Sequence, residues 1–163
     1  MTDNFIGYID DNLGNKYTVL KIYHKELWSK YIENSKVNLQ SIKAGPDSYI
    51  YFDTPNLFND TDDLMYCAFH NELLVSHVQY SEPMNMILTT CTHKEYRNRS
   101  ISSKLLEICI KDIKDSRIYI TAYSPEGEKF LHKKLQLLSN QTGKSLLQYN
   151  KDLGYPVDII TGL

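Results

Sequence analysis

The stretch that decides the fold reads Thr92-His93-Lys94-Glu95-Tyr96-Arg97-Asn98-Arg99-Ser100-Ile101-Ser102-Ser103-Lys104-Leu105-Leu106. The apolar residues 86–91 run into this stretch, which begins as a polar turn with two arginines and continues as an amphipathic helix. Where a strand ends in a turn at a helix N-terminus, the first N–H groups of the helix have no internal partner and can bind an anion. The stretch therefore predicts a strand, a turn and a helix, with an anion site where the helix begins.

The same stretch resembles the acyl-CoA-binding motif of the GNAT superfamily of N-acetyltransferases, whose usual form is V-x-P-E-Y-R-G-K-G-I-G-S-K-L-L. The residues that match in register are Glu95, Tyr96, Arg97, Ile101, Ser103, Lys104, Leu105 and Leu106. Ser100 and Ser102 replace the two signature glycines, and Lys94 replaces the usual proline. The resemblance covers residues 60–138 well and the two ends of the chain loosely.

The composition is that of an ordinary soluble globular protein. The chain has 163 residues, of which 42% are hydrophobic and 23% charged, so we expect a single domain over residues 1–163. The resemblance implies that this domain is acetyltransferase-like. The net charge of −2 argues against nucleic acid as a partner. No apolar run approaches the roughly 20 residues that span a bilayer, and the first residues lack a signal peptide. We therefore expect a cytoplasmic protein with no membrane association.

The three cysteines, Cys67, Cys91 and Cys109, are far apart and odd in number. Each lies among apolar residues, which predicts reduced, buried thiols. The five histidines are scattered without paired ligand spacing, so the sequence gives no indication of a metal site.

The order of the expected elements indicates an α/β fold. Strands are expected at residues 5–10, 17–23, 49–52, 64–69, 73–80, 86–92, 117–123, 145–150 and 157–160. Helices are expected at residues 24–34 and 100–114 and from Pro125, after Ser124 as N-cap, to about Leu138. Residues 11–15 have turn composition and 45–47 a break. This order predicts a mixed, partly antiparallel sheet flanked by helices, which is also the order of the GNAT family.

The resemblance implies that acetyl-CoA is the acyl donor and assigns its binding to Thr90, Cys91, Thr92, Arg97, Asn98, Arg99, Ser100, Ile101, Ser102 and Ser103. In this interpretation the N–H groups of residues 98–102 bind the pyrophosphate and the two arginines add charge. The end of strand 86–92 pairs with the pantetheine arm, where family members splay this strand from the next. The alternatives are an ordinary central strand and a plain N-cap at Ser100 with solvated arginines.

The acid that protonates the departing thiolate is often a tyrosine on the helix after residue 124 in the family. One alignment, of residues 131–137 with L-Y-E-K-L-G-F, places His132 at this position, and a second places Leu131 there. A histidine titrates near neutral pH and can serve as an acid. Tyr123, at the end of the preceding strand, is a further candidate, and a solvated His132 is the alternative.

Strand 86–92 carries no carboxylate that could act as a general base. Glu82 is one candidate, with His77 and His93 as others, and a water relay would need none of them. Asp60, Asp62 and Asp63 form an acidic segment that could attract a cationic amine, but such a segment is more often an ordinary solvated loop. The segment Thr142-Gly143-Lys144-Ser145 resembles part of a P-loop, but the required glycine is Leu138, so we regard the match as chance.

The sequence therefore predicts an N-acetyltransferase that transfers an acetyl group from acetyl-CoA to an amine on a small molecule or protein. The alternative is a catalytically degenerate GNAT-fold protein that acts as a protein-binding or regulatory module. The two missing glycines favour this alternative. The amine acceptor is not specified by the chain, and pairing with a second copy or with another protein stays open.

Overall fold

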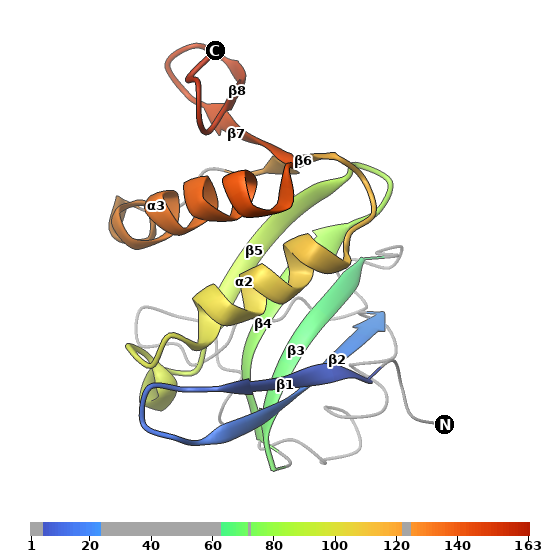
Figure 1. Cartoon of the computed structure of the whole chain (residues 1–163), viewed down its shortest axis with the longest axis vertical. Helices are drawn as coiled ribbons and strands as arrows, with labels where there is room; N and C mark the ends of the chain where they lie inside the picture. Colours follow the sequence, from blue (N-terminus) through green and yellow to red (C-terminus); the bar gives the residue numbers. More distant parts are fainter. Residues whose placement is uncertain (1–4, 24–62, 72, 122–124) are drawn as a thin grey trace, which may run out of the picture.

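The computed structural model describes residues 5–23, 63–71, 73–121 and 125–163 (Figure 1). The strands form one sheet in sequence order: β1 (Phe5–Asp10), β2 (Lys16–Tyr23), β3 (Leu64–His70), β4 (Leu73–Ser81), β5 (Met86–Thr92), β6 (Arg117–Ile120), β7 (Ser145–Asn150) and β8 (Tyr155–Asp158). The helices are η3 (Lys94–Tyr96, a 3₁₀ turn), α2 (Ile101–Asp112) and α3 (Pro125–Thr142).

The sheet changes from antiparallel to parallel at β5. Strands β1 to β5 pair as antiparallel neighbours, β5, β6 and β7 pair in parallel, and β8 returns antiparallel to β7. Parallel neighbours need a long crossover connection, which α2 supplies between β5 and β6 and α3 supplies between β6 and β7. The expected fold class, a mixed and partly antiparallel α/β sheet with helices packed against it, is confirmed.

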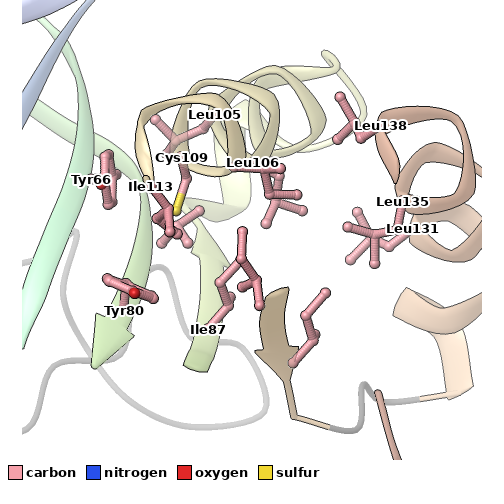
Figure 2. Packing of buried hydrophobic residues seen from close by; sticks show 14 of the residues in the cluster. Tyr66, Tyr80, Ile87, Leu105, Leu106, Cys109, Ile113, Leu131, Leu135 and Leu138 are labelled. Atoms are coloured by element: carbon pink, nitrogen blue, oxygen red, sulfur yellow. The ribbon is translucent and has the colours of Figure 1, made fainter. Parts of the chain in front are cut away.

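The core lies between the sheet and these two helices, which Figure 1 shows over the same face. The buried side chains of α2 recur at helical spacing and form one apolar face: Ile101, Leu105, Leu106, Cys109 and Ile110. In Figure 2 the helix α2 faces Tyr66, Tyr80 and Ile87 of the sheet, while α3 contributes Leu131, Leu135 and Leu138. This packing fixes the start of α2 relative to the end of β5.

The strands predicted at residues 5–10, 17–23, 64–69, 73–80 and 86–92 and the helix predicted at residues 100–114 are confirmed to within one or two residues. The helix α3 extends past the expected end at Leu138 to Thr142. It stops at Gly143, whose φ of +70° is favourable for glycine and whose N–H donates to the Ser139 carbonyl oxygen at 3.0 Å. The expected helix 24–34, break 45–47, strand 49–52 and acidic residues Asp60 and Asp62 lie outside the described residues.

Lys144 explains part of the segment that resembles a P-loop. Its Nζ donates to the Ile110 carbonyl oxygen at 2.6 Å and also to that of Ile113. These acceptors lie at the C-terminal end of α2, where carbonyl groups lack helical partners and the dipole favours a cation. Lys144 therefore stabilises the end of α2.

Two of the cysteines match the expectation of buried thiols and one differs. Cys67 and Cys109 are fully buried, and burial raises the pKa of both thiols. Cys91 is half-buried, because it lies near the end of β5. Within the described ranges, no helix is long and apolar enough to cross a membrane.

Candidate functional site

The described parallel pairing between β5 and β6 is short. The pairing joins Met86 to Tyr119 and Ile87 to Ile120, and the N–H of Thr121 donates to the Ile87 carbonyl oxygen at 3.1 Å. From Leu88 onward, no described strand pairs with this edge of β5. Among the described residues the two strands are therefore joined only at their start, and we call this arrangement the fork.

A β-bulge at Leu88 accounts for the fork. Gln79 of β4 pairs with Thr89 and Tyr80 with Ile87, so Leu88 is an extra residue in β5. A bulge of this kind bends the strand that carries it and increases its twist. The hydroxyl of Thr121 donates to the Leu88 carbonyl oxygen at 2.6 Å, which closes the base of the fork.

The turn after β5 folds back on the strand. His93 follows β5 as the N-cap of η3, and its Nδ1 accepts a hydrogen bond from the N–H of Glu95 at 3.1 Å. The Nε of Arg97 then donates to the Thr92 carbonyl oxygen at 3.0 Å. Both Asn98 and Ser100 have left-handed backbones, with φ of +63° and +64°. Alternating conformations of this kind can form a concave, anion-binding arrangement of N–H groups.

Ser100 precedes α2 in the conformation that glycine prefers. It has φ +64° and ψ +14°, and its side chain makes no capping hydrogen bond. It therefore occupies the N-cap position without acting as the plain N-cap considered above. The first N–H to bond back is that of Lys104, to the Ser100 carbonyl oxygen at 3.2 Å. The N–H groups of residues 101–103 therefore have no helical partner and carry the positive end of the helix dipole.

The turn between β1 and β2 is the tip of the blue hairpin in Figure 1. It packs against residues 97–100, which we call the loop before α2. Asn12 donates twice, from Nδ2 to the Asn98 carbonyl oxygen at 3.2 Å and from its N–H to the Arg99 carbonyl oxygen at 3.3 Å. Lys104 Nζ donates to the Asp10 carbonyl oxygen. Sequence reasoning identified residues 11–15 only as a turn, because nothing local indicates a contact 86 residues away.

The two arginines of the loop differ in their surroundings. Arg97 is exposed, whereas Arg99 is directed inward, with its guanidinium carbon 4.9 Å from the centre of the Tyr96 ring. Nη1 of Arg99 lies 3.9 Å from Oδ2 of Asp11, whose side chain is inaccessible to solvent. Arg97 is therefore the better placed of the two to meet a phosphate.

The acid candidates lie on or before α3. Leu131 is buried in the core, and Tyr123 lies outside the described residues. His132 is half-buried, and its Nδ1 has no hydrogen-bond partner among the described residues. Gln136, one turn later on the same side of α3, donates to the Ile159 carbonyl oxygen at 3.1 Å. That side of α3 therefore faces the C-terminal segment, and the structure does not bring His132 to the loop.

The base candidates are also dispersed. Glu82 is exposed in the turn before β5, where its carboxylate accepts a hydrogen bond from the Tyr23 hydroxyl at 3.3 Å. His77 is buried on β4, opposite Cys91. The buried ring of His93 supports η3, and burial lowers its pKa. Asp63 accepts from Gln79 Nε2 at 2.7 Å. Among the described residues, no cluster of His, Cys, Asp and Glu could hold a metal ion.

No protein-family model matches the chain, and a comparison with characterised proteins finds no significant match. Among solved structures, the chain is similar to the GNAT domain of S. lividans PAT, with a TM-score of 0.42 and 10% sequence identity. The similarity covers 87% of this chain and 76% of that one. At this level it says nothing about activity.

Proposed function

We propose that the protein is an acyl-CoA-dependent N-acetyltransferase, which transfers an acetyl group from acetyl-CoA to an amine. The observation that carries this proposal is the fork between β5 and β6, bulged at Leu88 and continuous with a left-handed turn at the start of α2. One end of this arrangement suits a diphosphate, and the other leaves an edge of β5 that has no partner among the described strands. A ligand with a diphosphate and an extended amide-bearing arm satisfies both.

In the proposed complex the diphosphate lies on the N–H groups of residues 101–103, with Arg97 as a nearby cation. The pantetheine arm follows the open edge of β5 from Thr92 toward Leu88, pairing with backbone groups as a strand would. The thioester then lies near the bulge, where the fork narrows. The side chains along this edge supply no charge, so binding there depends on the backbone.

The reaction needs no covalent intermediate on the protein. The neutral amine attacks the thioester carbon, and backbone N–H groups near the end of β5 stabilise the tetrahedral oxyanion. Collapse forms the amide and breaks the C–S bond, and the leaving thiolate takes up a proton. We retain His132 and Tyr123 as candidate acids and Glu82 as a candidate base, with water as the relay if none of them acts.

A second candidate function is a non-catalytic role as a protein-binding module of the same fold. Ser100 favours it, because a serine in the left-handed conformation adds a Cβ where a phosphate would approach the backbone. The two candidates differ in one property that can be measured, the release of free CoA in the presence of an amine.

The test is a titration with acetyl-CoA. A ligand at 100 times its dissociation constant stabilises a protein by about 2.7 kcal/mol, which a thermal shift would detect. Ser100→Asp should weaken binding at least tenfold by calorimetry, about 1.4 kcal/mol, because it places a negative charge at the diphosphate site. Aspartate tolerates the left-handed conformation, so the turn should keep its shape.

Ser116→Asp is the matched control, since Ser116 is an exposed serine beyond the opposite end of α2. It should leave the affinity unchanged. Thiol release with a panel of primary amines then separates the two candidates. Binding without turnover would favour the binding module. No binding of acetyl-CoA by the wild type would overturn the proposed acetyltransferase and would likewise favour the binding module.

A further inference from the structure

Asp11 is a buried carboxylate with an unusually full set of partners. It accepts hydrogen bonds from the Leu13 N–H at 2.8 Å, the Asn15 N–H at 2.8 Å, Asn15 Nδ2 at 3.0 Å and the Tyr17 hydroxyl at 2.6 Å. Burial acts to raise the pKa of Asp11, but these hydrogen bonds outweigh it and hold the pKa well below its ordinary value. The carboxylate is therefore charged at neutral pH and fixes the shape of the β1–β2 turn.

Arg99 supplies the opposite charge. Its guanidinium lies between the Asp11 carboxylate, 3.9 Å away, and the ring of Tyr96, 4.9 Å away. Tyr96 is itself held, since its hydroxyl hydrogen-bonds His70 Nδ1 at 2.9 Å and its ring packs edge-on against Tyr17. The side chain of Arg99 is thus fixed from two sides, by Asp11 of the β1–β2 turn and by Tyr96 of η3.

The loop depends on such support. A left-handed backbone is unfavourable for serine and persists only where the surroundings over-determine it. The contacts that do so at residues 98–100 come from the β1–β2 turn, through Asn12 to the carbonyl oxygens of Asn98 and Arg99. Because Asp11 fixes this turn and also faces the Arg99 side chain, it restrains the loop through both.

We propose that Asp11 is a positioning residue for the anion site: through Arg99 and the β1–β2 turn, it holds Ser100 in the left-handed conformation that aims the first N–H groups of α2 at a diphosphate. The proposal rests on the proposed function for the identity of the ligand. It assigns Arg99 a role in shaping the loop, while direct contact with the phosphates falls to Arg97 and the backbone.

The test uses Asp11→Asn with Asp112→Asn as a matched control. Asp112 also accepts a hydrogen bond from a tyrosine hydroxyl, that of Tyr66 at 2.7 Å, and from the cation Lys21 at 2.8 Å, but it lies at the far end of α2. By calorimetry with acetyl-CoA, Asp11→Asn should weaken affinity about tenfold and Asp112→Asn should leave it unchanged.

Rescue separates positioning from general stability. Glycine adopts the left-handed conformation without support, so adding Ser100→Gly to Asp11→Asn should restore most of the lost affinity. A merely structural role for Asp11 would give Ser100→Gly no larger gain in affinity in Asp11→Asn than in the wild type. If Asp11→Asn does not fold, Asn12→Ala removes only an exposed contact with the loop and should weaken affinity about threefold, with the same rescue.

A readout without ligand keeps this proposal distinct from the proposed function. In ¹H–¹⁵N spectra of the unliganded protein, the amide signals of residues 98–103 should shift in Asp11→Asn and return toward wild type when Ser100→Gly is added. Wild type that fails to bind acetyl-CoA would reject the proposed function and leave this result standing. Unchanged amide signals in Asp11→Asn would overturn the positioning role.

Discussion

Replacing Ser100 by glycine should stabilise the protein, although glycine at a helix start usually does the opposite. Ser100 has φ +64° and its hydroxyl makes no capping hydrogen bond, so the substitution removes strain and loses no side-chain contact. The left-handed conformation costs a residue with a Cβ about 1–2 kcal/mol, and glycine adds about 0.4–1 kcal/mol of chain entropy to unfolding.

The difference leaves a net stabilisation of about 0.5–1 kcal/mol, which corresponds to roughly 1–4 °C in melting temperature for a chain of this size. The assay is urea unfolding followed by circular dichroism, with the midpoint compared at an unchanged slope. Ser102→Gly is the internal control, because Ser102 lies inside α2 and glycine there should destabilise by about 0.5 kcal/mol. A Ser100→Gly midpoint at or below that of Ser102→Gly would refute the left-handed assignment.

Three further predictions concern other parts of the molecule. If His132 protonates the leaving thiolate, His132→Ala should lower turnover roughly 100-fold with acetyl-CoA affinity unchanged; a loss confined to Tyr123→Phe would move the role there, and a loss in neither would leave it to water. Burial acts to raise the pKa of Asp112, but hydrogen bonds from a lysine and a tyrosine outweigh it and lower this pKa below its ordinary value of 3.8. The contribution of the Asp112 carboxylate to stability is therefore present above pH 3.8 and is lost as the pH falls further. Asp112→Asn should therefore flatten the fall in urea midpoint below about pH 4. Lys144→Met should destabilise by about 1–2 kcal/mol, because two carbonyl oxygens at the end of α2 lose a charged donor; unchanged stability would show that water replaces it.

The strands and helices that the sequence predicted well are those with strong local periodicity. Residues 86–92 and the helix after them follow from apolar spacing alone, and both agree with the structure. The fork between β5 and β6 does not follow from apolar spacing. It depends on the register between β4 and β5, where one extra residue at Leu88 bends the strand. No local pattern distinguishes that leucine from its neighbours.

The candidate site shows the same division. The strand, turn and helix start were predicted from the local sequence, and the left-handed Ser100 lies where the resembling motif has glycine. The anion site at this turn stays a prediction. The inward position of Arg99 was not predicted, because it depends on Asp11, which is 88 residues away and had been interpreted only as part of a turn. Contacts between residues so far apart in the sequence are set by the packing of the whole sheet, and the local periodicity of the sequence does not predict them.

The strand order has a consequence for how the chain is made. Neighbouring strands in the sheet are also consecutive in the sequence, so each strand that leaves the ribosome meets a partner that is already present. The β1–β2 turn is synthesised before residues 98–104 and can dock them as soon as they emerge. The left-handed turn would then be in place while β6, the second arm of the fork, is still to be translated.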